Sequence, residues 1–292
     1  MELFDALIIG HGPAGCSAAL YLCRAGKRVV VIGKDRGALG KAEKIENYYG
    51  LPQAMRGRDL VSAGRRQCAE LGAQMRKDEV LSLDWLDDGT FEAQLAESEP
   101  VTAKTALLAT GKVTHIPNIE GIQDFEGKGV SYCAVCDAFL YRGREVAVLG
   151  GGAYARHEME ELLPLAKRVT LFTHGAEPEF DPPKEVRVFT KRLLRLYGEE
   201  TLSAAEMEDG GTQDLQGLFV ALGTASAGDL ARKLGLQLKN NAVPVGTSQE
   251  TTLPGLFAAG DCTGSFAQVA FAVAEGAKAG LGMIAYLRAM NN

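Results

Sequence analysis

The feature that most constrains the fold of this 292-residue chain is an apolar strand that leads into a glycine-rich turn and a helix, and that occurs twice. Residues 5–10 (DALIIG) predict a buried strand, residues 14–25 a helix with few charges, and KRVVVIG at 27–33 a second, β-branched strand. The strands REVAVLG at 144–150 and RVTLFTH at 168–174 flank a second helical segment in the same way. A strand, a crossover helix and a parallel strand form a β-α-β unit, so we expect two parallel sheets.

A third glycine-marked strand decides how the two units are connected. The segment 255–261 predicts a strand, and a helix of small residues follows from about 268 to 288, without a β-α-β partner of their own. The simplest arrangement returns this strand and helix to the first domain, which makes the second domain an insertion. We therefore predict an α/β protein with two Rossmann-like domains of the three-layer ββα kind. The first comprises residues 1–112 and 223–292, and the second comprises residues 113–222.

Composition and charge limit the classes of function. Glycine accounts for 35 of the 292 residues without a three-residue period, which excludes collagen and indicates many tight turns against a ligand. The formal net charge of −6 argues against nucleic acid as a partner. The sequence has no run of 18 apolar residues to cross a membrane, and MELFDALIIGHG enters a strand without a basic leader segment. We therefore expect a cytoplasmic protein.

The first glycine turn, GHGPAG at 10–15, fits the G-x-G-x-x-G pattern of dinucleotide-binding turns. Gly10 permits the tight turn, Gly12 lets the backbone approach a pyrophosphate, and Gly15 allows close packing of helix on strand. The N-terminus of the helix would then face the phosphates. The alternative is a glycine-rich turn in an α/β sheet with no ligand. One element of the pattern is missing, because Gly33 stands where an acid that binds ribose is expected.

The second glycine turn, GGGAYA at 150–155, has the pattern of an NAD or NADP site. NADP binding calls for arginines just beyond the next strand, but residues 173–177 read Thr-His-Gly-Ala-Glu, and Arg187 is too distant to assign. Tyr154 places a bulky ring in the turn, and Pro164 interrupts the helix. The alternative interpretation is a Rossmann shell that has lost its ligand.

The segment Cys133-Ala-Val-Cys136-Asp137 carries the strongest chemical signal. Two cysteines three residues apart can close a small reversible disulfide, and Asp137 is placed to protonate a departing thiolate. One alternative is half a zinc site, but the sequence has no second C-x-x-C, and His115 and His157 lack ligand spacing. The other alternative is inert thiols. We interpret the remaining cysteines as buried small hydrophobic residues: Cys16, Cys23, Cys68 and Cys262.

The strand LFAAGD ends in Gly260 and Asp261. An aspartate at the carboxyl end of a parallel strand can accept a hydrogen bond from a ligand hydroxyl. The helix that begins near Gln268 and Val269 can direct its free N–H groups at an anionic ring edge. Alternatively, Asp261 only caps the turn.

Together these motifs resemble the low-molecular-weight thioredoxin reductase family over nearly the whole chain. The resemblance rests on six segments in order: GHGPAG, IENYYG at 45–50, LLATG at 107–111, SYCAVCDAFLYRG at 131–143, GLFVALG at 217–223 and LFAAGDCTG at 256–264. It implies a flavin-dependent disulfide oxidoreductase, with FAD in the outer domain and a redox disulfide in the inserted domain. It also implies a homodimer, thioredoxin as the substrate, and a hinge rotation between the domains.

The resemblance also implies roles for single residues. Cys136 would face the flavin, Cys133 would attack thioredoxin, and Asp137 would donate the proton. Asp261 would bind the ribityl chain, and Gln268 and Val269 would lie near the flavin ring. The other expected FAD contacts are Gly10, Gly12, Pro13, Ala14, Gly15, Asn47, Thr110, Gly111 and Gly260.

Departures from the family pattern concern the electron donor. Members that use NADPH have a His-Arg-Arg type of stretch where this chain has Thr173-His174-Gly175, and a Gly-Gly-Gln segment where 37–41 reads GALGK. These features and the short inserted domain resemble the subgroup that accepts electrons from ferredoxin, although the intact turn at 150–155 favours a dinucleotide. We therefore expect a donor other than NADPH, with NADH- or NADPH-dependent reduction as one alternative. A flavin-binding redox sensor without turnover is the alternative of another class.

Overall fold

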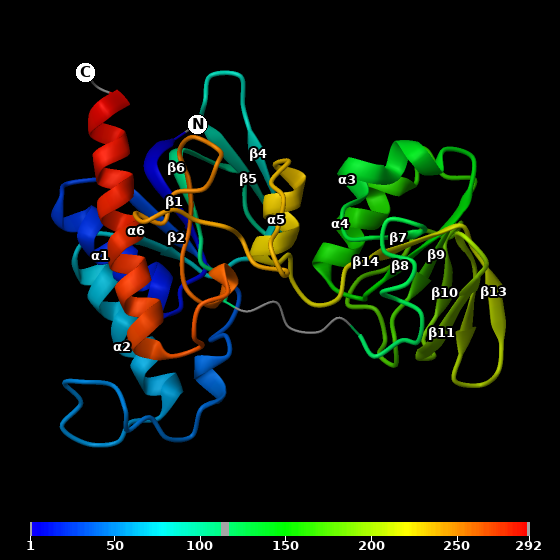
Figure 1. The fold of residues 1–292 in the computed structure, drawn as a ribbon, viewed down its shortest axis with the longest axis horizontal. Coiled ribbons are helices and arrows are strands. Elements are labelled where there is room, and N and C mark those ends of the chain that lie inside the picture. The colour runs from blue at the N-terminus through cyan, green and yellow to red at the C-terminus, as the bar shows by residue number, and fades with distance from the viewer. Residues whose placement is uncertain (1, 112–116, 291–292) are drawn as a thin grey trace. The chain divides into compact units, whose positions relative to one another are not determined.

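The computed structural model describes residues 2–111 and 117–290, and the chain divides into two compact units (Figure 1). The first unit is Met1–Val113 with Ser226–Asn292, and the second is Thr114–Ala225. The domain limit predicted at residue 112 lies outside the described residues, and the one predicted at 222 lies close to the end of the second unit.

The first unit is built on a seven-stranded sheet in the order β3-β2-β1-β6-β5-β4, with β15 also paired to β6. The strands β1, β2, β3, β6 and β15 run parallel, whereas β4, β5 and β6 form an antiparallel meander. The strand bounds are Leu3–Ile9 (β1), Val29–Ile32 (β2), Gln74–Arg76 (β3), Val80–Trp85 (β4), Phe91–Leu95 (β5), Val101–Leu108 (β6) and Leu256–Ala258 (β15). The carboxyl ends of the parallel strands therefore share one sheet edge, where most of the predicted FAD contacts lie.

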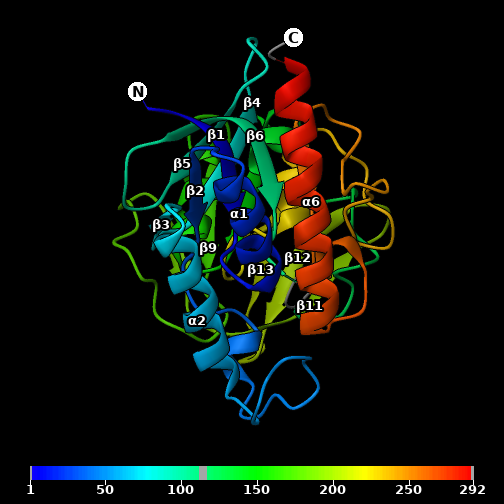
Figure 2. The same ribbon diagram turned by 90° about the vertical axis from the view of Figure 1, so that its left-hand side faces the viewer.

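Three helices pack side by side over one face of this sheet (Figure 2): α1 (Pro13–Arg24), α2 (Gly57–Glu70) and α6 (Val269–Met290). The backbones of α1 and α6 approach closely, because a Cβ atom on Gly276 would lie 2.0 Å from the carbonyl oxygen of Ala14. By length and composition α6 could cross a membrane. It instead buries a stripe that includes Ala279, Met283 and Leu287 in the core of the unit, as a core helix does.

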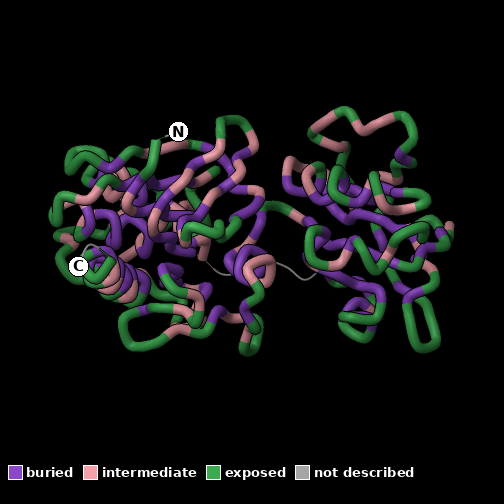
Figure 3. Tube along the Cα trace, turned by 90° about the horizontal axis from the view of Figure 1, so that it is seen from above, coloured by how far each residue is buried: buried purple, intermediate pink, exposed green. Residues whose placement is uncertain are grey.

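The second unit has a five-stranded, all-parallel sheet in the order β10-β9-β8-β14-β7, and a separate antiparallel sheet β11-β12-β13. The parallel strands span Val130–Ser131 (β7), Glu145–Leu149 (β8), Arg168–Phe172 (β9), Arg187–Phe189 (β10) and Gly217–Val220 (β14). The antiparallel strands span Leu193–Gly198 (β11), Leu202–Met207 (β12) and Thr212–Asp214 (β13), and the helices span Ala134–Asp137 (α3) and Ala153–Leu162 (α4). Both units keep their central strands buried (Figure 3).

The parallel sheets and their helices confirm the predicted α/β class with Rossmann-like domains. The last strand and helix lie in the first unit, where β15 pairs with β6 and α6 packs on α1. Helix α4 ends at Leu162, just before Pro164. The short helix α5 (Ala227–Lys233) was not predicted, although Ser226 and Asp229 form the capping box that begins it. The described residues also form three 3-10 helices: Leu39–Lys41 (η1), Ala138–Tyr141 (η2) and Asp261–Thr263 (η3).

Candidate functional site

The first glycine turn joins β1 to α1 and has the geometry of a dinucleotide cradle. Gly10 has a φ of 112°, and a Cβ atom on it would lie 2.1 Å from the carbonyl oxygen of Ala109. A Cβ atom on Gly15 would lie 1.9 Å from the carbonyl oxygen of Gly10. At Gly12, by contrast, no described atom other than those of its chain neighbours lies within 4 Å of the Cβ position. The turn is therefore closed on the protein side and open beside Gly12, as the pyrophosphate of FAD requires.

The residues after β6 and β15 meet at the same edge of the sheet. The hydroxyl oxygen of Thr110 accepts the N–H of Ala227 at 2.9 Å, and the backbone at Gly111 continues with a positive φ of 81°. A Cβ atom on Gly260 would lie 3.0 Å from the Cβ of Ala14, so the strand end before Asp261 lies against the start of α1. This places Asp261 beside the first glycine turn, where it is expected to reach a cofactor hydroxyl.

Glu275 on α6 holds this strand end, a role that the sequence did not indicate. Its Oε2 accepts the N–H of Gly260 at 2.8 Å and the hydroxyl of Thr263 at 3.1 Å. These bonds fix the turn that carries Asp261 at the start of η3.

Two residues expected near the flavin are brought together from distant parts of the chain. The side-chain amide of Asn47 donates to Oε1 of Gln268 at 2.9 Å. Val269 is the first residue of α6, as expected for the helix that begins here. The structure thus brings the loop containing Asn47 to the start of α6, within the first unit.

Gly33, which follows β2 where an acid that binds ribose is expected, lies against the side chain of His11. A Cβ atom on Gly33 would lie only 2.4 Å from Nδ1 of His11, so the imidazole occupies the space that a side chain at position 33 would need. The ring is buried, and its Nε2 donates to the carbonyl oxygen of Asp35. Burial lowers the pKa of His11, which keeps the ring neutral near pH 7. The spacing of the motif did not predict that the His11 ring would occupy the space beside Gly33.

In the second unit, Cys133 and Cys136 form a disulfide with their Cα atoms 5.4 Å apart, at the end of β7. Cys133 is the N-cap of α3, and its Sγ accepts the N–H of Cys136 at 3.1 Å. Cys133 is 4% exposed, whereas Cys136 is exposed. The hydroxyl of Ser131 donates to Oδ2 of Asp137 at 2.7 Å, which orients the predicted proton donor. Cys133, Cys136 and Asp137 are thus brought together, and Ser131 is a contact that the sequence analysis missed.

Glu158 on α4 is a second missed residue. Its side chain is 1% exposed, and Oε2 accepts the N–H of Ala134 at 2.6 Å, directly after Cys133. A buried carboxylate therefore ties the cysteine segment to the helix that follows the second glycine turn. Tyr154 lies on the same helix, and its ring is buried, with the hydroxyl 3.4 Å from the carbonyl oxygen of Tyr132. The interpretation that this ring fills the second turn is therefore wrong, because it packs into the core.

The segment after β9 contains no arginine but lies beside one. The hydroxyl of Thr173 donates to the carbonyl oxygen of Ala176, which folds the chain back on itself. A Cβ atom on Gly175 would lie 3.1 Å from Nε of Arg192. Arg192 therefore lies beside the segment where NADP-binding domains hold the 2′-phosphate, although it is distant from that segment in the sequence.

The four remaining cysteines are free thiols. Cys16, Cys68 and Cys262 are buried, and Cys68 donates to the carbonyl oxygen of Cys16 at 3.4 Å. Burial raises the pKa of Cys262 to about 12, so this thiol is not a nucleophile. Cys16, Cys68 and Cys262 thus agree with the interpretation as buried small side chains, whereas Cys23 is only half-buried.

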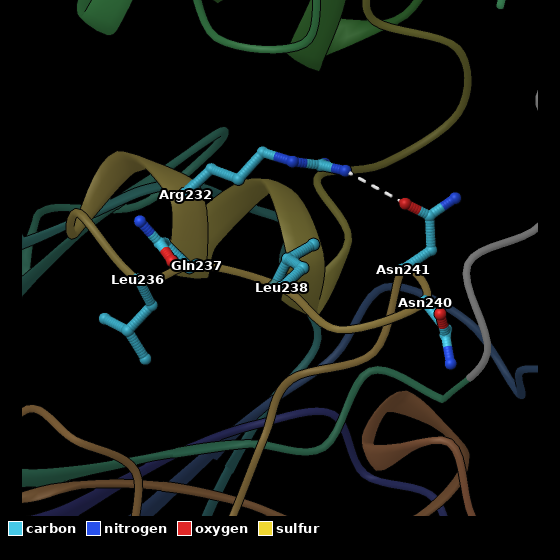
Figure 4. A pocket seen from close by; sticks show the side chains of 6 residues that line it. All are labelled: Arg232, Leu236, Gln237, Leu238, Asn240 and Asn241. Carbon is cyan, nitrogen blue, oxygen red and sulfur yellow. Dashed lines mark hydrogen bonds between the residues drawn. The ribbon is translucent and has the colours of Figure 1, made fainter.

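A pocket of about 620 Å³ lies elsewhere in the first unit, at α5 and the loop after it (Figure 4). Arg232 reaches Oδ1 of Asn241 across its mouth at 3.4 Å. Its lining contains none of the predicted cofactor contacts; the residues are Arg232, Leu236, Gln237, Leu238, Asn240 and Asn241. With regard to metals, the described residues contain no cluster of His, Cys, Asp and Glu that could hold an ion, and His115 lies outside them.

Comparison with known proteins agrees with this geometry. The family model of pyridine nucleotide-disulphide oxidoreductases matches residues 4–276, and the chain therefore belongs to that family. The thioredoxin reductase of Aquifex aeolicus (strain VF5) is 30% identical over 98% of this chain and 94% of its own. The crystal structure of the atypical thioredoxin reductase from Desulfovibrio vulgaris Hildenborough has a TM-score of 0.92 and 41% identity, with 98% of each chain covered. A ferredoxin-flavin thioredoxin reductase from Clostridium acetobutylicum has a TM-score of 0.77 and 29% identity, with 99% of each chain covered.

The protein is accordingly an oxidoreductase of the thioredoxin reductase type, a flavin-dependent disulfide oxidoreductase.

Proposed function

We propose that the protein reduces thioredoxin with electrons that pass from a donor to FAD and then to the Cys133–Cys136 disulfide. The observation that carries the proposal is this disulfide at a strand end, with Asp137 beside it and oriented by Ser131. FAD held at the first glycine turn would supply the chemistry that links a donor to a two-electron disulfide. Asp261, Asn47 and Gln268 would orient it from the edge of the same sheet.

The environments of the two sulfurs suit different steps. Reduction requires attack on a reachable sulfur, and Cys136 is the exposed one. Cys133 then leaves as a thiolate, which the N–H of Cys136 stabilises by a hydrogen bond. Cys133 is 4% exposed in the disulfide form, so we propose that reduction and domain rotation uncover its thiolate, which then attacks the thioredoxin disulfide and forms a mixed disulfide. Cys136 attacks the Cys133 sulfur of this mixed disulfide, re-forms the internal disulfide and releases reduced thioredoxin, with Asp137 protonating the leaving thiolate.

We further propose that the electron donor is a low-potential ferredoxin. Plant-type ferredoxins have potentials of about −400 mV and thioredoxin about −270 mV, so the transfer is downhill. The loop after β9 supports the proposal, because residues 173–177 supply no arginine for a 2′-phosphate. The similarity to a protein described as a ferredoxin-flavin thioredoxin reductase points in the same direction.

We also propose a cytoplasmic homodimer with thioredoxin as its partner. The free thiols of Cys16, Cys23, Cys68 and Cys262 suit a reducing compartment, where cysteines stay unpaired. Size-exclusion chromatography with light scattering tests the oligomeric state, and a monomer at micromolar concentration would contradict it.

A second candidate function, NADPH-dependent reduction of thioredoxin, is favoured by one observation: Arg192 lies beside Gly175. Anaerobic stopped-flow mixing distinguishes the donors. The purified holoprotein is mixed in turn with reduced ferredoxin, NADPH and NADH, and bleaching of the flavin absorbance is followed. We expect fast bleaching with ferredoxin alone, and rapid bleaching by micromolar NADPH or NADH would contradict the proposed donor.

The roles of the cysteines are tested with Cys133→Ser. This variant is expected to bind flavin and be bleached by the donor, but to lose thioredoxin-dependent insulin reduction by at least about a thousandfold, because the nucleophile toward thioredoxin is absent. Cys23→Ser, which removes a half-buried free thiol, serves as the matched control and should keep full activity. Full activity of Cys133→Ser would show that the roles are wrong. Inactivity of the chemically reduced wild type with every thioredoxin tried would favour a redox sensor.

A further inference from the structure

The segment that follows β9 folds over the second glycine turn. The backbone N–H of Glu179 donates to the carbonyl oxygen of Gly151 at 2.7 Å. A Cβ atom on Gly151 would lie 3.6 Å from Cα of Pro178 and from Cβ of Thr173. A Cβ atom on Gly152 would lie 3.4 Å from a carboxylate oxygen of Glu179. The chain is thus at van der Waals distance from the two glycines that a dinucleotide would have to approach.

The carboxylate of Glu179 lies beside Gly152 at the N-terminus of α4, so its negative charge affects what can bind there. Gly152 is the N-cap of α4, and the N-terminus of a helix carries partial positive charge that attracts anions. In dinucleotide-binding turns the pyrophosphate lies against this helix end. The first turn of α4 contains no acidic residue of its own, and Glu179 brings a carboxylate to this end from outside the helix.

We propose that Pro178 and Glu179 exclude nicotinamide dinucleotides from the second glycine turn, and so determine donor specificity. The Glu179 carboxylate occupies space beside Gly152 and repels an incoming pyrophosphate. Pro178 closes the approach to Gly151. This inference rests on the proposed function, in which the donor is not a nicotinamide.

The experiment measures binding of NADH and NADPH to the holoprotein by isothermal titration calorimetry, with flavin bleaching as a parallel readout. The double variant Pro178→Gly, Glu179→Gly opens the turn and is expected to bind at least one dinucleotide at least about tenfold more tightly than the wild type. NADPH is expected to gain at least as much as NADH, because Arg192 lies beside Gly175. Glu179→Gln keeps the backbone bond and the shape of the side chain, so it isolates the charge and is expected to show a smaller gain.

Glu177→Gln is the matched control, because it removes the same charge from an exposed position on the same segment. It is expected to leave dinucleotide binding unchanged. If the double variant does not fold, as judged by circular dichroism and the flavin spectrum, Glu179→Gln alone decides.

The outcomes separate the two proposals. Weak binding to the wild type with no gain in either Glu179 variant would overturn the inference about this segment, while the proposed donor stands. An equal gain in Glu177→Gln would also overturn it, since a general charge effect would then explain the result. Tight binding to the wild type with rapid bleaching would overturn the proposed donor as well.

Discussion

The two glycine turns of this protein have nearly the same backbone and different surroundings. Gly12 and Gly152 are N-caps with φ and ψ of −77° and −170° in the first turn and −97° and −172° in the second. The glycine that opens each turn has a positive φ, and a Cβ atom there would lie 2.1 Å from the carbonyl oxygen of Ala109 at Gly10 and 2.2 Å from that of Ala221 at Gly150. Both turns are therefore fixed against the neighbouring parallel strand in the same way.

The difference lies on the outer side of each turn. The Cβ position of Gly12 faces open space among the described residues, whereas that of Gly152 faces the carboxylate of Glu179. The two turns show that the G-x-G-x-x-G pattern specifies the turn and the start of the helix, but not whether a ligand can approach. Access depends on a loop that the pattern does not include.

The largest expected effect on stability comes from replacing the glycine that opens each turn. Gly10→Ala and Gly150→Ala each place a Cβ atom against a carbonyl oxygen at a positive φ, and each is expected to lower the free energy of unfolding by about 3 kcal/mol or more. Trp85, the one tryptophan in the chain, lies on β4 and reports the first unit by fluorescence. In urea unfolding of the apoprotein, Gly10→Ala should therefore shift the fluorescence transition, and Gly150→Ala only the transition seen by circular dichroism.

Gly26→Ala is the control for that pair. Gly26 has a φ of 69°, but no described atom lies within 4 Å of its Cβ position, so only backbone strain remains, of about 1 kcal/mol. If Gly10→Ala is no more destabilising than Gly26→Ala, the contact with Ala109 does not fix the turn.

An intermediate effect is expected from adding a Cβ atom at the second glycine of each turn, Gly12 or Gly152, where the surroundings of the two turns differ. Gly12→Ala fills the open space and is expected to weaken FAD binding at least about tenfold, or about 1.4 kcal/mol, without destabilising the apoprotein. Gly152→Ala should change neither FAD affinity nor stability by more than about 0.5 kcal/mol, since its Cβ would meet the Glu179 carboxylate and the carbonyl oxygen of Gly223 only at van der Waals distance. FAD affinity is measured by quenching of flavin fluorescence. Unchanged affinity in Gly12→Ala would mean that the pyrophosphate does not approach this residue.

The smallest effect is a pH dependence that differs between the units. Burial lowers the pKa of His11 in the first turn, and burial together with Arg192 lowers the pKa of His174 after β9, both from 6.5. Below pH 6.5 the unfolded chain therefore binds more protons than the folded protein, so the free energy of unfolding falls as the pH falls, until the folded histidines are protonated too. From about one pH unit above 6.5, where the histidines are neutral in both states, these groups contribute no slope.

His11→Asn should remove the slope from the Trp85 transition, and His174→Asn should remove it from the transition of the second unit. Asparagine suits position 174, where φ is 56°. Slopes that persist in both variants would assign the pH dependence to other groups.

Much of the fold followed from local patterns. The apolar strands, the small-residue helices and the glycine between them predicted two parallel sheets. The lone final strand indicated a return to the first domain, but its neighbour β6 came only from the structure. The cysteine pair with Asp137 was equally visible, because its chemistry depends on residues close in sequence. Ser226 and Asp229 form a capping box that is also visible in the sequence, three residues apart at the start of α5.

Contacts between distant segments were not predictable in this way. Glu158 bonds to Ala134 from the helix after β8, and Glu275 holds Gly260 from the far side of a loop. The ring of His11 occupies the space beside Gly33 because the turn directs it there. The sequence showed that the acid is missing at position 33, but not that His11 fills the space. The buried ring of Tyr154 shows the same limit, since sequence position alone placed it in the turn.

The sequence by itself determined the two β-α-β turns, the close cysteine pair and the class of chemistry, because each depends on residue types at short spacing. Only the tertiary structure decided which turn is open. The path of the loop after β9 sets the distance between Glu179 and Gly152, and that path depends on packing and hydrogen bonds rather than on any local pattern.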